Sequence, residues 1–91
     1  MSELKYKATW HKSALKGLKM LKRKPDLQKR LDRKIIEILS DPYHYKPLRN
    51  VLKNRRRTHI GSFVLVFEIN EEEKTIIFHS FDHHNDVYKS K

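Results

Sequence analysis

Hydrophobic and polar residues change their spacing along this chain, first following a helical period and later alternating. Before the helical part, residues 4–10 alternate apolar and polar side chains, which predicts a short strand. Two helical stretches follow, with Ser13 as the expected N-cap of the first and Pro25 in the first turn of the second. Their apolar positions are Ala14, Leu15, Leu18 and Leu21, then Leu27, Leu31, Ile35, Ile38 and Leu39. Residues 40–42 (Ser-Asp-Pro) are expected to end the second helix.

The second half of the chain has the pattern of strands joined by short turns. Residues 42–50 read as an irregular connection, and from Val51 the pattern becomes strand-like. Gly61-Ser62 is typical of a tight turn. Phe63, Leu65, Phe67 and Ile69 then alternate with Val64, Val66 and Glu68, which is the strongest strand signal in the chain. A polar loop at residues 70–73 leads into a last predicted strand at residues 75–81.

The predicted order is therefore strand, two helices, and then a three-strand antiparallel meander. Such an order indicates an α+β fold, in which the helices pack on one face of a twisted sheet. The opposite face is then expected to be open to solvent or to a ligand. With only 91 residues, the chain is expected to form a single domain, residues 1–91, with a small core.

Composition narrows the classes of function. The chain has no cysteine, so disulfides and thiolate metal sites are excluded. Hydrophobic residues make up 37% and charged residues 35%, at the polar end of the range for globular proteins. The sequence shows neither an apolar run of membrane-spanning length nor the apolar core of a signal peptide, so we expect a cytoplasmic protein with no membrane contact.

Positive charge is concentrated in one part of the chain, which carries a net charge of +10. Residues 1–57 contain 18 Lys and Arg against 5 Asp and Glu, whereas residues 58–91 contain 3 against 6. An excess of Lys and Arg of this size favours a polyanionic partner, because phosphates attract the positive side chains and release their own counterions on binding. The same excess of positive charge would also be explained by a solubilising surface or by an acidic protein partner.

Three consecutive arginines, residues 55–57, lie in the half of the chain predicted to form the sheet. Side chains two apart on a strand share a face, so Arg55, Arg57 and His59 should project together, with Arg56 and Thr58 on the other side. A solvated basic run is the alternative interpretation. Arginine binds phosphate and stabilises the charge that develops on phosphorus during transfer.

Histidines near the chain end add possible proton-transfer groups. A meander could bring His59, His83 and His84 together at one end of the sheet. Neutral imidazole accepts the proton of a ribose 2′-hydroxyl, and protonated imidazole donates one to the leaving 5′-oxygen. Tyr88 could position the phosphate or stack on a base. Together these groups suffice for RNA cleavage through a 2′,3′-cyclic phosphate without a metal.

Two further questions are the role of the other histidines and the possibility of a metal site. We expect His11, His44 and His79 to be surface or structurally satisfied residues. Residues 82–86 (Asp-His-His-Asn-Asp) contain possible metal ligands, but adjacent histidines on a strand rarely converge on one ion, and no helical His-x-x-x-His spacing is present. The chain also lacks a glycine-rich phosphate loop. No metal or cofactor is therefore predicted.

The order of these segments is similar to that of a known family. Residues 47–69, the acidic turn after them, and residues 83–88 (His-His-Asn-Asp-Val-Tyr) resemble the RelE branch of the RelE/ParE superfamily of type II toxin–antitoxin toxins. The resemblance covers nearly the whole chain. It implies a RelE-like fold, an endoribonuclease that cuts mRNA on the ribosome, and a cognate antitoxin, which we expect to be acidic.

The resemblance also implies roles for particular residues. Arg55 and Arg57 match the basic second-strand residues that bind and stabilise the phosphate, and His59 falls where many relatives have another basic residue. His83 and Tyr88 match the terminal histidine and tyrosine. The candidate catalytic residues are thus Arg55, Arg57, His59, His83, His84 and Tyr88, and the candidate RNA-binding residues are Lys46, Arg49, Lys53 and Arg56.

Two positions depart from the family pattern: Val64 and His84 stand where many relatives have arginine. Two alternatives to an mRNA endoribonuclease follow. One is a ParE-like toxin that inhibits DNA gyrase by binding it, and the other is a non-catalytic RNA-binding module. The His- and Tyr-containing chain end argues against the first, because a toxin that only binds needs no proton transfer.

Overall fold

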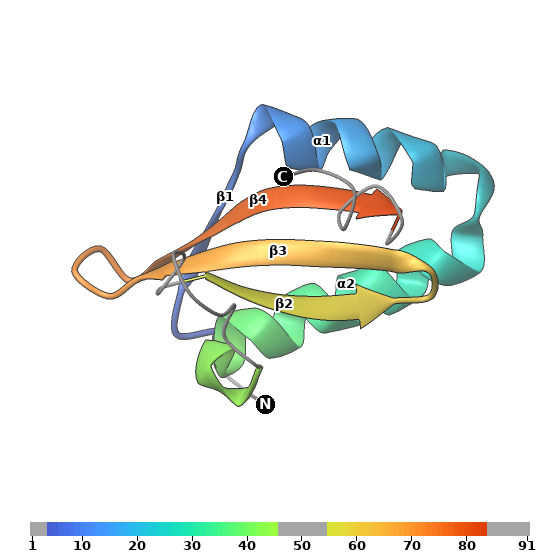
Figure 1. Cartoon of the computed structure of the whole chain (residues 1–91). Helices are drawn as coiled ribbons and strands as arrows, with labels where there is room; N and C mark the ends of the chain where they lie inside the picture. The colour runs from blue at the N-terminus through green and yellow to red at the C-terminus, as the bar shows by residue number, and fades with distance from the viewer. Residues whose placement is uncertain (1–3, 46–54, 84–91) are drawn as a thin grey trace.

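The computed structural model of the chain describes residues 4–45 and 55–83. These residues form a four-stranded sheet and two main helices (Figure 1). The elements are β1 (Lys7–Trp10), α1 (Lys12–Lys19), η1 (Met20–Arg23), α2 (Pro25–Ser40), η2 (Pro42–His44), β2 (Arg55–Ile60), β3 (Phe63–Asn70) and β4 (Thr75–His83), where η marks a short 3₁₀ helix.

The sheet has the strand order β1-β4-β3-β2. β2, β3 and β4 form the predicted antiparallel meander, and β1 runs parallel to β4 at the far edge. Both helices pack on one side of this sheet, with α1 over β4 and α2 behind β2 and β3 (Figure 1). The predicted α+β architecture is confirmed. The place of β1 beside β4, outside the meander, was not part of the prediction.

The hydrophobic core lies between the helices and the sheet. Phe63 stacks on Phe81 with ring centroids 5.0 Å apart, and Trp10 stacks on Phe78 at 4.3 Å. The buried residues of this core include Ala14, Leu21, Leu31, Ile38, Ile60, Leu65, Phe67, Ile69 and Ile76. Their positions match the helical and alternating patterns of the sequence, and burial of apolar area of this kind is the main stabilising term in folding.

Helix boundaries agree with the sequence except at the start of α1. Helix α2 begins at Pro25 and ends at Ser40, as predicted. The prediction of Ser13 as an N-cap is wrong, because His11 caps α1 by accepting a hydrogen bond from the Ser13 backbone N–H at Nδ1, 3.2 Å away. The His11 backbone N–H donates to the Phe78 carbonyl at 2.9 Å, so His11 joins the end of β1 directly to the helix.

The predicted turn at Gly61-Ser62 connects β2 to β3. Gly61 has φ +62°, a left-handed conformation that glycine adopts without strain. The turn pairs Ile60 with Phe63 and so sets the register of the whole hairpin. No helix within residues 4–45 and 55–83 is long and apolar enough to cross a membrane.

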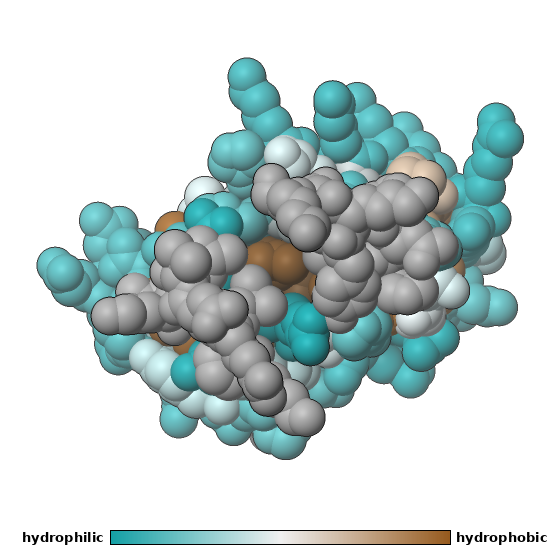
Figure 2. Space-filling view, in the orientation of Figure 1, coloured by the Kyte–Doolittle hydropathy of each residue, from teal (hydrophilic) through white to brown (hydrophobic). Residues whose placement is uncertain are grey.

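The second face of the sheet is not open along its centre. Val64 and Val66 lie on the side away from the helices, yet they are 0% and 8% exposed. In Figure 2 apolar atoms are visible at the centre of this face, next to a hydrophilic group. The expectation of a fully open second face is therefore wrong for β3.

Helix α1 approaches β4 most closely at Gly17. A Cβ atom added there would lie 1.7 Å from the Phe81 carbonyl oxygen, so the helix backbone rests directly on the strand backbone. Only a residue without a side chain permits this distance.

We predict that Gly17→Ala lowers the free energy of unfolding by roughly 3 kcal/mol, because backbone atoms of α1 or β4 must move apart. Urea unfolding followed by circular dichroism measures the change. Lys16→Ala, at the exposed neighbouring position of the same helix, serves as the control and should stay within about 0.5 kcal/mol of the parent. Equal stability of the two variants would contradict this account of the α1–β4 contact.

Candidate functional site

Three of the candidate residues lie in one row on β2. Arg55 pairs with Glu68, Arg57 with Val66 and His59 with Val64, so all three side chains share the face away from the helices. Arg56 and Thr58 face the helices, as the alternation predicts, and Thr58 is buried. Because β2 is an edge strand, this row lies along the border of the sheet.

Glu68 on β3 connects the basic row to a histidine on β4. Its Oε1 atom lies 3.8 Å from Arg55 Nε and 2.7 Å from His79 Nε2. The His79 side chain is 19% exposed, so it is partly accessible from outside. The three side chains thus cross the second face of the sheet from β2 through β3 to β4.

A β-bulge in β4 lies at His79. Val66 pairs with Ser80 and Phe67 with Phe78, so His79 has no partner on β3. An extra residue of this kind re-aims its side chain and shifts the alternation of the strand beyond it. Phe78 and Phe81 consequently both face the core, although they are three residues apart.

His83 lies at the same end of the sheet as His59 but on the other face. It pairs with Phe63, and its ring packs edge-on against the Phe63 ring at 5.8 Å, on the side of the helices. Asp82, which pairs with Val64, is the β4 residue that shares the face of His59. The structure therefore brings the two histidines to one end of the sheet but not to a common surface.

His59 is exposed and lies next to helix α2. It lines a pocket of ≈ 160 Å³ together with cationic residues of α2. The lining residues are Arg30, Arg33, Lys34, Glu37, His59 and Ile60. This pocket extends the positive charge of β2 around the edge of the sheet, where an anion would be attracted.

Arg56 makes contacts within the protein. Its Nη1 donates a hydrogen bond to the Tyr45 carbonyl oxygen at 2.6 Å, and its guanidinium lies 5.1 Å from the centre of the Tyr43 ring. These contacts fix Arg56 on the helix side and give no support to its candidate role in RNA binding. The other candidates Lys46, Arg49, Lys53, His84 and Tyr88 lie outside the described residues.

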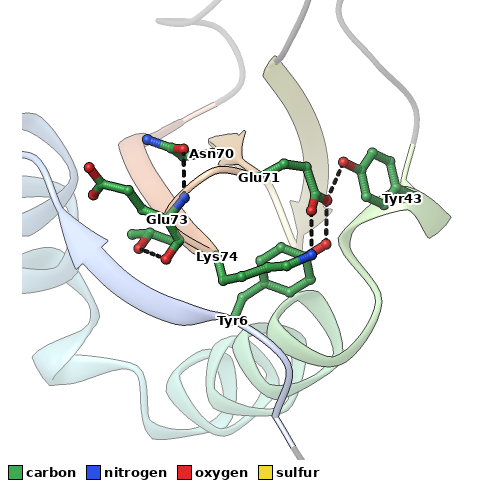
Figure 3. A network of polar contacts seen from close by, with 7 residues as sticks. Tyr6, Tyr43, Asn70, Glu71, Glu73 and Lys74 are labelled. Atoms are coloured by element: carbon green, nitrogen blue, oxygen red, sulfur yellow. Dashed lines mark hydrogen bonds and ion pairs between the residues drawn. The ribbon is translucent and has the colours of Figure 1, made fainter.

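A second polar cluster, centred on Glu71, closes the opposite end of the sheet (Figure 3). The Glu71 carboxylate accepts hydrogen bonds from the Tyr6 hydroxyl at 2.5 Å, from the Tyr43 hydroxyl, and from Lys74 Nζ at 2.6 Å. These contacts join the β3–β4 turn to η2 and to the segment before β1. An adjacent polar pocket of ≈ 380 Å³ is lined by Tyr43, Arg56, Glu68, Ile69, Asn70, Glu71 and Glu72.

The Glu71 cluster also shifts proton affinities. Hydrogen bonds from Lys74, Tyr43 and Tyr6 lower the pKa of Glu71 to about 2. The same carboxylate raises the pKa of Tyr43 to about 12. These shifts fit an ionised carboxylate that holds neutral tyrosines in place. Because its hydrogen bonds join three segments that are distant in the sequence, we assign this cluster to stability.

Sequence reasoning missed Glu68 and His79 as a linked pair. The alternation did place Glu68 on the second face, but its contact with His79 joins two strands, and the spacing of residues along the chain gives no signal for it. Within residues 4–45 and 55–83, no group of three or more His, Asp or Glu side chains is arranged to hold a metal ion.

Comparisons with known proteins agree with this architecture. The family model described as "ParE toxin of type II toxin-antitoxin system, parDE" matches residues 8–88. A protein of Methanocaldococcus jannaschii named "Putative toxin RelE4" is 47% identical over 74 residues, covering 80% of this chain and 79% of that protein.

Solved toxin structures share the fold. The toxin–antitoxin complex RelBE2 from Mycobacterium tuberculosis contains a chain with a TM-score of 0.74 and 21% identity, covering 90% of this chain and 94% of its own. The archaeal RelE–RelB complex from Pyrococcus horikoshii contains one with a TM-score of 0.68 and 16% identity, covering 87% and 94%.

The fold is therefore that of the RelE/ParE superfamily, which the sequence resemblance predicted correctly. This chain belongs to the ParE toxin family and is a toxin of a type II toxin–antitoxin system.

We predict that Glu71→Gln makes stability less sensitive to acid. Because the folded protein lowers the pKa of Glu71 from 4.5 to about 2, its carboxylate stabilises the fold above pH 4.5 and loses this effect as the pH falls toward 2. The parent should thus be more stable than the variant at pH 6, and the gap should close below pH 4.5.

Urea unfolding at a series of pH values measures this gap. Glu72→Gln, in the same exposed turn, is the matched control, because Glu72 has the same charge but does not accept the hydrogen bonds that Tyr6, Tyr43 and Lys74 donate to Glu71. A difference between parent and Glu71→Gln that stays constant from pH 6 to pH 2 would show that the carboxylate is not the stabilising group.

Proposed function

We propose that this toxin is a metal-independent endoribonuclease that cleaves mRNA on the ribosome. The observation that carries the proposal is the row of Arg55, Arg57 and His59 on one face of β2. The row combines phosphate ligands with a group that exchanges protons near neutral pH. The reaction is attack by the ribose 2′-hydroxyl, which leaves a 2′,3′-cyclic phosphate.

Arg57 is the central residue of the proposed site. It lies between Arg55 and His59 on the same face of β2. Because of this central place in the row, we assign the main stabilisation of the phosphorane charge to Arg57. His59, which is exposed, then gives a proton to the leaving 5′-oxygen.

Residues outside the described ranges complete the proposal. Tyr88 is proposed to orient the substrate, and His84 to add a titratable group beside it. Lys46, Arg49 and Lys53 are proposed to bind the RNA backbone. His83 is kept as a secondary candidate for proton transfer, because its ring packs against Phe63 on the helix side of the sheet.

The relatives support both the activity and a protein partner. The Methanocaldococcus jannaschii protein is named as a RelE toxin, and the two solved structures are complexes of a toxin with its antitoxin. We therefore propose a cognate antitoxin for this chain. An acidic antitoxin would complement its charge of +10 and bind with electrostatic steering. We place the protein in the cytoplasm, where its mRNA substrate and the ribosome are found.

The matching family model gives a specific reason to keep a second candidate. Its description is that of a ParE toxin, so inhibition of DNA gyrase by binding is the alternative. The two candidates differ in their first product. An endoribonuclease shortens transcripts in expressing cells, whereas a gyrase inhibitor leads to broken DNA with intact transcripts.

We predict that Arg57→Ala lowers RNA cleavage about 100-fold or more and relieves growth arrest, because it removes the central cation of the row. Primer extension on transcripts from expressing cells measures cleavage, and circular dichroism confirms folding. Arg23→Ala, which removes the same charge from exposed η1, should cleave as the parent does. A folded Arg57→Ala variant with parental cleavage would refute the site, and broken DNA with intact transcripts would favour the ParE-like alternative.

A further inference from the structure

The Glu68–His79 pair has the geometry of an oriented imidazole. Glu68 Oε1 and His79 Nε2 are 2.7 Å apart, within the range of a strong charge-assisted hydrogen bond. An ionised carboxylate has no proton to give, so His79 Nε2 must carry the proton and donate it. In the neutral ring, Nδ1 is then the free acceptor. A carboxylate that fixes the tautomer in this way prepares histidine to act as a base.

The position of the pair relative to the arginines also fits a role in the reaction. Arg55, which forms an ion pair with the same Glu68 oxygen, and Arg57 lie on β2, while His79 lies on β4. The two sides are therefore separated by roughly two strand spacings, about 10 Å. Extended arginine side chains and an RNA phosphate span this distance. A phosphate held by the arginines would therefore have His79 on one side and the exposed His59 on the other end of the row.

The bulge gives a second, independent observation. Regular alternation from Phe78 places His79 on the second face and would place Ser80 on the core side. The bulge removes His79 from backbone pairing and keeps Ser80 on the second face beside it. Bulges occur frequently beside active sites, where they re-aim a side chain.

We propose that His79 is the general base of the RNA cleavage and that Glu68 is its positioning residue; this inference rests on the proposed function. The proton of the 2′-hydroxyl passes to His79 Nδ1 while the 2′-oxygen bonds to phosphorus. The bond between phosphorus and the 5′-oxygen then breaks, and that oxygen takes a proton from the His59 imidazolium. Solvent returns both rings to their starting states.

The groups that face His79 come from three elements. Glu68 on β3 bonds it, Arg55 on β2 acts through Glu68, and the His11 ring at the end of β1 lies 6.1 Å from it, centroid to centroid. These contacts, on three sides of the ring, fix the place of His79 on the second face.

The test compares His79→Gln and Glu68→Gln with the parent in single-turnover cleavage of an mRNA, with ribosomes present, between pH 5 and 9. The glutamine amide at position 79 can still donate to Glu68, but it cannot accept a proton. Cleavage should fall about 100-fold or more, and the limb of the pH–rate profile that reports the base should disappear. Glu68→Gln should slow cleavage by a smaller factor. His44→Gln, on exposed η2, is the control and should match the parent.

A second measurement does not depend on activity or on the variants. Nitrogen-15 NMR of the parent should show His79 protonated at Nε2 and unprotonated at Nδ1 in its neutral form. The opposite tautomer would overturn the proposal, as would parental rates and an unchanged pH profile in His79→Gln. If either result is found while the parent still cleaves RNA, the role of His79 is overturned and the proposed function stands. A parent that cleaves no RNA would overturn both the role of His79 and the proposed function.

Discussion

The register between β2 and β3 is the constraint on which the rest of this structure depends. The Gly61-Ser62 turn pairs Ile60 with Phe63, and each later pair follows from that one. A slip of one residue would turn Arg55, Arg57 and His59 toward the helices and bring Arg56 and Thr58 to the second face. The buried side chains of β3 oppose such a slip, because the phenylalanines and leucine of its core side would lose their contacts. Hydrophobic packing thereby determines which cations reach the candidate site.

The bulge in β4 is the second determinant of the site, because it decides which face of the sheet His83 takes. Regular alternation from Phe78 would carry His83 to the second face, whereas the extra residue turns it to the helix side, where its ring packs against Phe63. His79, which the sequence suggested was a surface or satisfied residue, stays on the second face and bonds Glu68.

Much of the fold could be predicted because its elements have clear periods. Helix α2, the β2–β3 turn and strand β3 follow directly from spacing, and so does the common face of Arg55 and Arg57. The bulge, the His11 cap and the place of β1 could not be predicted, since each depends on contacts between segments distant in the sequence. The same holds for the polar cluster that joins Tyr6 and Tyr43 to Glu71. Local pattern therefore indicated the basic row but not its carboxylate and imidazole partners.

The chemical nature of the RNA ends tests the central claim most directly. The purified toxin is incubated with a defined mRNA on ribosomes, and both fragments are analysed by mass spectrometry. Attack by the 2′-hydroxyl predicts a 2′,3′-cyclic phosphate on the upstream fragment and a free 5′-hydroxyl on the downstream one, in buffer containing EDTA at a concentration that leaves the ribosomes intact. A 5′-phosphate on the downstream fragment, or RNA that stays whole, would contradict the account.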